Sequence, residues 1–138
     1  TATVFLRDCL RALKTTAIFD FETKSLRVAN SGLPHPLHYR ATDRRAAPID
    51  VSGLPLGTFD GVTYDEVSVE LAKGDVVVLY SDGLSEAPSP SGEEYGTARI
   101  ARHCEADYAT VETLLGDVNG FLAGRPASDD QTVVMIRA

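Results

Sequence analysis

Asp82 stands where proteins often carry a functional side chain. It lies in the segment YSDGLSEA (80–87), at the end of an apolar run, and Gly83 behind it lets the chain turn sharply. Because active-site groups are commonly carried where a strand gives way to a loop, Asp82 is a candidate for chemistry. An Asp-Gly pair also forms ordinary turns, so that interpretation stays open. Glu86, four residues further on, is either a second carboxylate of the same site or a solvated residue.

Two adjacent carboxylates precede the last apolar segment of the chain. Asp129 and Asp130 stand in SDDQT (128–132), directly before VVMIR. If that segment is a strand, one of the two side chains can face inward, although paired Asp residues in a loop can equally be solvated. Two separate carboxylate groups at strand ends favour a hard divalent cation, since Mg²⁺ and Mn²⁺ take oxygen ligands from carboxylates and water.

The histidines give a weaker signal. His35 and His38 lie two residues apart on a candidate strand and would share one side of it as a metal pair, but no third His or Cys lies nearby in the sequence. The segment NSGLPHP (30–36) is explained by a structural turn as well as by a substrate contact. The segment LPLG (54–57) is interpreted as a loop anchored on apolar neighbours, without chemistry of its own.

The elements that would position these residues follow from hydrophobic periodicity. The apolar run at 76–80 is typical of a strand buried on both faces, so we expect it to be central in a sheet. Other strands are predicted over 15–21, 25–30, 35–40 and 131–137, and a half-exposed strand over 62–71 with a bulge between residues 64 and 67. The stretch 41–55 is predicted to be a loop with at most a short strand at 49–51.

Helical spacing is found over Ala2–Lys14, Thr97–Ala106 and Thr110–Ala123. In the last of these, Thr110 is a plausible N-cap, and Gly124 with Pro126 should end the helix. Strands in two runs with helices segregated between them favour an α+β fold with a mostly antiparallel sheet over a doubly wound fold.

Length and charge exclude several classes of protein. A chain of 138 residues with 43% hydrophobic and 24% charged residues fits one globular domain, 1–138, with its own core. Thirteen basic against twenty acidic residues give a net charge of −7, which disfavours nucleic-acid binding. No apolar stretch is long enough for a membrane span and no leader pattern opens the chain, so we expect a cytoplasmic protein. Cys9 and Cys104 lack disulfide or zinc spacing and are expected to be buried free thiols.

The order of the segments resembles a known family. NSGLPHPLHYR, then LPLG, then LAKGDVVVLYSDGLSEA, GEEYGTARI and SDDQTVVMIR together are similar to the C-terminal half of PPM-type protein serine/threonine phosphatases. The bacterial branch typified by SpoIIE and RsbU is the most similar. The resemblance runs from about Thr15 to the end of the chain, and the combination of GDVVVLYSDGLSEA with DDQT is its specific part.

The resemblance implies a fold and a site. Members of the family fold as two stacked antiparallel sheets flanked by helices, and hold two Mn²⁺ or Mg²⁺ ions between the sheets. It implies that Asp82 and Asp129 are ligands of one metal, with Asp130 at a neighbouring and less favoured position; Gly83, Asp130 and Glu86 are candidates either for binding the metal or for lying around its ligands. The metals would activate a water that attacks phosphorus in line, so no side chain would act as the nucleophile.

This sequence also departs from the family pattern. The Gly-Gly-Asp-aromatic-x-Asp or Asp-Gly-His-Gly segment that supplies the bridging Asp does not occur in it, and Leu33 stands where the family's NAGHPPP segment often has His. We therefore expect a domain that lacks the family's N-terminal portion, either a fragment or an impaired relative, with at most one weak metal site.

The resemblance implies a phosphatase acting on phosphoserine or phosphothreonine. Its partner would be a phosphorylated regulatory protein of the anti-anti-sigma (STAS) type, in partner-switching control of a sigma factor. The alternative is a non-catalytic module that keeps the fold as an interaction surface. The oligomeric state cannot be predicted from the sequence.

Overall fold

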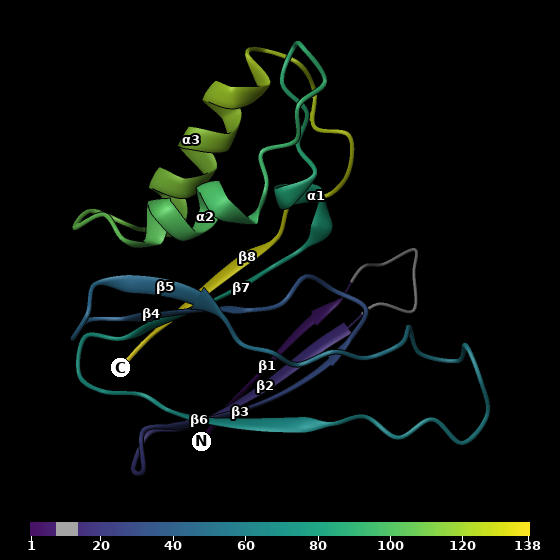
Figure 1. The fold of residues 1–138 in the computed structure, drawn as a ribbon, viewed down its shortest axis with the longest axis vertical. Coiled ribbons are helices and arrows are strands. Elements are labelled where there is room, and N and C mark those ends of the chain that lie inside the picture. The colour runs from purple at the N-terminus through teal and green to yellow at the C-terminus, as the bar shows by residue number, and fades with distance from the viewer. Residues whose placement is uncertain (8–13) are drawn as a thin grey trace.

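Two four-stranded antiparallel sheets form the body of the protein (Figure 1). The computed structural model describes residues 1–7 and 14–138. The first sheet has the order β1-β2-β3-β6 and contains β1 (Ala2–Arg7), β2 (Lys14–Asp20), β3 (Ser25–Ser31) and β6 (Glu66–Glu70). The second has the order β5-β4-β7-β8 and contains β5 (Arg45–Pro48), β4 (Leu37–Arg40), β7 (Val76–Tyr80) and β8 (Val133–Arg137).

β7 lies between β4 and β8 and is buried along its whole length, which confirms the predicted central strand. Its alternate side chains enter two different cores because successive residues of a strand point to opposite faces. Val76, Val78 and Tyr80 pack toward the helices, whereas Val77 and Leu79 pack toward the first sheet. A continuous apolar run is needed here, since neither face of β7 meets water.

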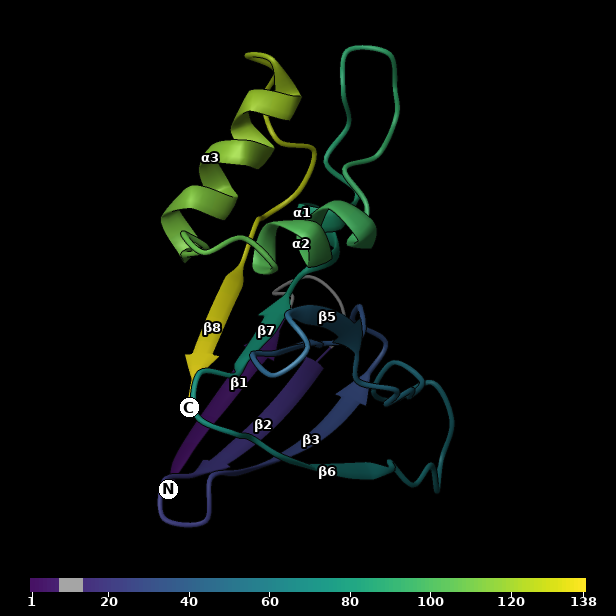
Figure 2. The ribbon, with the colours of Figure 1, turned by 60° about the vertical axis from the view of Figure 1, so that its left-hand side comes forward.

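The helices cover the second sheet on the face that points away from the first sheet (Figure 2). They are α1 (Asp82–Ser85), α2 (Thr97–Cys104) and α3 (Val111–Leu122). Ile100, Leu114 and Val118 of α2 and α3 are fully buried in the same core cluster as the helix-facing side chains of β7. The described part of the chain therefore forms a helix layer, a sheet and a second sheet, and the α+β fold with stacked antiparallel sheets is confirmed.

α3 begins as the sequence predicted. The Thr110 side chain accepts a hydrogen bond from the Thr113 amide at 3.1 Å, and the Thr113 hydroxyl accepts one from the Thr110 amide at 2.9 Å. This reciprocal cap satisfies amides that the first turn of a helix leaves without partners. The helix ends at Leu122, where Ala123 takes a left-handed conformation with φ of 50°, before the predicted stop at Gly124.

The predicted helix over residues 2–14 is wrong where the structure describes it. Ala2–Arg7 is a strand that pairs antiparallel with β2, and Lys14 already belongs to β2. Antiparallel pairing of residues 2–7 with β2 outweighs the helical spacing of the apolar positions. Residues 8–13, including Cys9, lie outside the described residues, whereas Cys104 is a buried free thiol as predicted.

Two smaller predictions also need correction. The short strand is β5 at Arg45–Pro48, not 49–51, although Ile49 and Val51 are buried. The half-exposed strand is confined to β6, so the irregular spacing near residue 64 lies in a loop and not in a bulge. The LPLG segment is a loop as predicted, with Leu54 and Leu56 48% and 43% exposed.

A buried hydrogen bond joins β4 to the turn that precedes β7. His38 on β4 contacts Asp75 before β7, with Nε2 and Oδ2 2.9 Å apart. Asp75 also accepts hydrogen bonds from the amides of Ala41 at 2.9 Å and Ala72 at 3.1 Å. These contacts fix the turn that delivers the chain into β7, and thereby the position at which β7 ends.

Candidate metal site

The segments carrying Asp82 and the Asp129–Asp130 pair meet at the end of β7. The β7–β8 pairing brings Tyr80 opposite Val133, so the residues after β7 face the residues before β8. Ser81 joins them directly: its hydroxyl donates to the Asp130 carbonyl at 3.0 Å and accepts from the Thr132 amide at 3.0 Å. Two segments about fifty residues apart in sequence are thus held side by side.

Gly83 makes this approach sterically feasible. A Cβ added at Gly83 would lie 2.4 Å from the Asp130 carbonyl oxygen and 3.2 Å from the Asp129 carbonyl carbon. Gly83 is buried, and backbone atoms cannot move aside as a flexible side chain can. The glycine that the sequence suggested for a sharp turn is therefore required for close packing of two backbones. The segment around Asp82 is the start of the short helix α1, so the plain-turn interpretation is wrong.

Each of the two predicted ligands is oriented by a hydrogen bond of the same kind. The Gly83 amide donates to Oδ1 of Asp82 at 2.9 Å, and the Asp130 amide donates to Oδ1 of Asp129 at 2.8 Å. A hydrogen bond from the next residue's amide restricts how each carboxylate can rotate. Asp82 is partly buried and Asp129 is exposed, so a ligand held by both would reach them from solvent.

The other predicted residues lie around this pair in different ways. Asp130 is exposed and contributes its carbonyl to the contact with Ser81. Glu86 is the exposed C-cap of α1, and its amide donates to the Asp82 carbonyl at 2.7 Å. Both side chains are exposed, and Asp130 and Glu86 are placed here by backbone groups, the Asp130 carbonyl and the Glu86 amide.

Ser81 is the residue that sequence reasoning missed. It lies between a buried strand and a candidate ligand, and it is 7% exposed, which leaves its hydroxyl to find partners within the protein. A buried serine beside a strand-end carboxylate is the signal that could have indicated it. Its partner on the other segment could not be inferred without the β7–β8 register.

The two histidines do not form a metal pair. β4 begins at Leu37, so His35 lies outside the strand and the two-residue period does not apply to it. His38 is engaged by Asp75, and His35 lies beside Ser52 and Asp50. Within the described residues, no group of three or more His, Cys, Asp or Glu side chains could enclose a metal ion.

Burial removes two other groups from chemistry at neutral pH. Burial raises the pKa of the Cys104 thiol to about 11, so its thiolate form is scarce. Burial also raises the pKa of Tyr80 on β7, where its hydroxyl donates to Thr97 at 3.2 Å. The carboxylates at the end of β7 are left as the chemically useful groups of this region.

The carboxylates fit a hard cation in kind but fall short in number. Mg²⁺ and Mn²⁺ are bound by oxygen ligands, about six of them, and Asp82 with Asp129 would supply only part of that set.

None of the helices among the described residues has the length and apolar character needed to cross a lipid bilayer.

Comparison with known proteins assigns the fold. The family model described as Stage II sporulation protein E (SpoIIE) matches residues 7–138. The phosphoserine phosphatase RsbU of Bacillus subtilis (strain 168) is 28% identical over 76 residues, which cover 55% of this chain and 23% of that protein. The alignment is therefore with less than a quarter of RsbU.

Solved structures agree with this result. The PP2C phosphatase domain of SpoIIE from Bacillus subtilis, with a fragment of its regulatory domain, superposes with a TM-score of 0.76 at 23% identity, covering 91% of this chain and 37% of that chain. The RsbU and RsbW domains of Rv1364c from Mycobacterium tuberculosis give a TM-score of 0.72 at 25% identity, covering 92% and 36%. The chain spans little more than a third of either solved chain.

Proposed function

Since the chain belongs to the SpoIIE family of PP2C-type (PPM) phosphatases, we propose that it forms the metal-binding C-terminal part of a protein serine/threonine phosphatase. The observation that carries the proposal is the joint at Gly83 and Ser81, which packs the Asp82 and Asp129 segments against each other in a fold shared with solved phosphatases.

Asp82 and Asp129 would hold one Mn²⁺ or Mg²⁺ ion. Support comes from their matching amide contacts, which fix both carboxylates, and from their carboxylate chemistry. Among solved relatives, a SpoIIE phosphatase domain was presoaked with Mn, and RsbX was crystallised in complex with magnesium. A bound divalent cation would polarise a phosphate group and make a coordinated water more acidic.

The chain's own residues would position that ion. Ser81 and Gly83 hold the two segments together, and the exposed side of Asp129 leaves an approach from solvent. Asp130, next to Asp129, and Glu86, the C-cap of α1, are exposed carboxylates that would add negative charge to this region. The remaining ligands would come from water or from a portion of the domain that this sequence does not match.

The names of the relatives support a substrate class. RsbU is a phosphoserine phosphatase, and Rv1364c combines RsbU and RsbW domains. We extend this to a phosphorylated regulatory protein of the anti-anti-sigma type, in cytoplasmic partner-switching control of a sigma factor. The net charge of −7 favours a protein partner over a nucleic acid.

A second candidate is a non-catalytic interaction module with the same fold. This candidate is favoured because the described residues offer only two suitable carboxylates, whereas a site for two metal ions needs more ligands. The two candidates make different predictions for a longer protein in which the family's upstream acidic segment is joined to this chain. The phosphatase candidate predicts that this longer protein hydrolyses phosphate esters, and the interaction module predicts that it does not.

Hydrolysis of p-nitrophenyl phosphate and of a phosphoserine protein in Mn²⁺ tests the proposal. The 138-residue chain should show no metal-dependent turnover, because one half-site cannot place two metals about 3.5–4 Å apart. The longer protein should be active and should lose activity on Asp82→Ala or Asp129→Ala, while Asp60→Ala in the exposed loop should have no effect. An inactive longer protein would favour the interaction module.

A further inference from the structure

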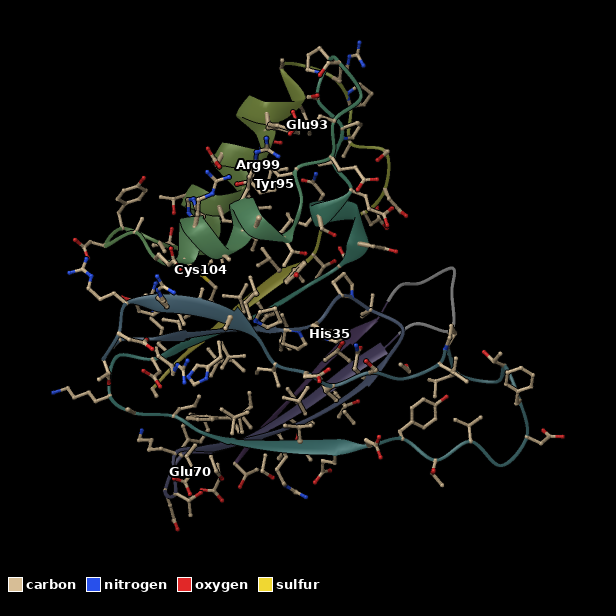
Figure 3. The ribbon with its side chains drawn as sticks, viewed as in Figure 1. His35, Glu70, Glu93, Tyr95, Arg99 and Cys104 are labelled. Atoms are coloured by element: carbon tan, nitrogen blue, oxygen red, sulfur yellow. The ribbon has the colours of Figure 1, made fainter. Side chains whose placement is uncertain are left out.

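Ser52, His35 and Asp50 lie in the order of a hydrolytic triad, apart from the candidate metal ligands. The Ser52 hydroxyl is 3.3 Å from Nε2 of His35, and Nδ1 of His35 is 3.9 Å from Oδ1 of Asp50. Figure 3 labels His35 in the segment that leads into β4. Each imidazole nitrogen thus faces a different partner, the serine on one side and the carboxylate on the other.

The loops that carry these residues are fixed by a buried asparagine. Asn30, at 2% exposure, donates from Nδ2 to the Leu33 carbonyl at 2.7 Å and to the Val51 carbonyl at 3.2 Å. Its Oδ1 accepts from the Thr15 hydroxyl at 2.8 Å. One side chain therefore ties the segment before His35 to the residue between Asp50 and Ser52.

Two further contacts fix the backbone next to His35, Asp50 and Ser52. The Ile49 amide donates to the Pro36 carbonyl at 2.7 Å, which holds the residue after His35 against the residue before Asp50. A Cβ at Gly53 would lie 1.9 Å from the Asn30 carbonyl oxygen, so Gly53, the residue after Ser52, packs directly against the backbone of Asn30. The backbone on either side of Ser52, His35 and Asp50 is therefore fixed, which favours a reproducible placement of the three residues.

The two partners of His35 are arranged so that its imidazole can act as a base toward Ser52. With the imidazole proton on Nδ1, which faces Asp50, Nε2 is able to accept the hydroxyl hydrogen of Ser52. The His35 side chain is 38% exposed and that of Asp50 is 97% exposed, so solvent weakens the electrostatic effect of the Asp50 carboxylate on His35. Most of the activation must come from His35 and little from Asp50.

We propose that Ser52 is an activated nucleophile that takes an acyl group from small carboxylic esters, with His35 as its base. Ser52 Oγ forms a bond to the ester carbonyl carbon while its proton passes to His35 Nε2. The carbon–oxygen bond to the leaving group then breaks, and the leaving oxygen keeps the electron pair. Protonated His35 releases its proton to that oxygen or to water, which leaves an O-acyl serine. This activity requires no metal and goes beyond the proposed phosphatase function.

Acetylation by p-nitrophenyl acetate in the presence of a metal chelator tests the proposal on the intact chain. Peptide mass spectrometry should find an acetyl group on Ser52, formed faster than on Ser68, an exposed serine of β6 that lies opposite Arg27. Ser52→Ala should remove that mass shift. His35→Gln should slow the acetylation of Ser52 by ~10–100-fold, at the low end of general-base effects because the site is open.

Matched variants separate activation from accessibility. Asp50→Asn should slow acetylation of Ser52 only about twofold, since an exposed charge is screened. His103→Gln, which alters a histidine of α2 that contacts Thr113, should leave it unchanged. An acetylation rate of Ser52 equal to that of Ser68, or one unaffected by His35→Gln in a folded variant, would overturn the proposal whatever the outcome for phosphatase activity.

Discussion

Gly83 is the residue on which the candidate metal site most depends. Gly83→Ala would place a methyl group 2.4 Å from the Asp130 carbonyl oxygen, so the two segments must separate. We expect the free energy of unfolding to fall by about 1–3 kcal/mol, as in other overpacked sites. Urea denaturation measures this change.

The control for this variant is Gly116→Ala on α3, where nothing lies within 4 Å of the added Cβ. That substitution should raise the free energy of unfolding by about 0.5–1 kcal/mol, because alanine favours a helix over glycine. An equally well tolerated Gly83→Ala would show that the segments are not closely packed there.

Asp75 should make stability depend on pH. Burial alone would raise its pKa, but hydrogen bonds from the Ala41 amide, the His38 ring and the Ala72 amide outweigh burial and lower the pKa below the ordinary value of 3.8. A carboxyl whose pKa is lowered by folding stabilises the folded state above its unfolded pKa, and this contribution is lost as pH falls through the folded pKa. Stability should therefore decline below about pH 4.

The variant Asp75→Asn isolates this contribution. It should be less stable at pH 7 by about 1–3 kcal/mol, because the buried amides lose a charged acceptor. Its thermal midpoint should change less between pH 5 and pH 3 than that of the parent. Parallel pH profiles for parent and variant would contradict the assignment.

Residue types indicated the candidate ligands, but not their partners. The positions of Asp82 and Asp129 next to apolar runs pointed to strand ends, and the β7–β8 register brought those ends together. Ser81 and His35 could not be assigned from the sequence in the same way. Their roles depend on contacts with residues 15 or more positions away, which no local pattern encodes.

At the scale of elements, β7 is the part of the fold that the sequence specifies best. Val78 is fully buried between the sheet and the helices, so Val78→Asp would bury an unpaired charge. We expect this variant not to fold, as judged by circular dichroism and by a missing cooperative unfolding transition.

Ser68→Asp provides the matched control on an exposed strand. Ser68 lies on β6 opposite Arg27, so a new carboxylate meets solvent and a cation. Its stability should stay within about 0.5 kcal/mol of the parent. A stable Val78→Asp variant would be inconsistent with a central, doubly buried β7.

Helix and strand predictions failed where tertiary pairing decides the structure. The spacing of apolar residues over Ala2–Lys14 predicted a helix, yet Ala2–Arg7 pairs with β2 and is a strand. β5 has few apolar residues and exists because it pairs with β4, and α1 is too short to show a period. α3, in contrast, has its cap and its apolar face within one continuous segment, so local sequence was sufficient.

At the scale of the whole molecule, the fold was predictable because segment order carries the family pattern. NSGLPHP, GDVVVLYSDGLSEA and DDQT occur in an order that the family match over residues 7–138 bears out. The extent of the site was harder to predict, since it depends on which carboxylates gather in space. The described residues bring two candidate ligand segments together and no larger acidic group.

Calorimetric titration with Mn²⁺ tests the central claim, that Asp82 and Asp129 form one half-site. We predict weak binding, with a dissociation constant above about 1 µM because water must supply most of the ~6 ligands. Binding should be lost in Asp82→Asn and in Asp129→Asn and kept in Asp60→Asn, an exposed carboxylate of the 57–61 loop. Sub-micromolar affinity, or affinity unchanged in the Asp82→Asn and Asp129→Asn variants, would contradict the account.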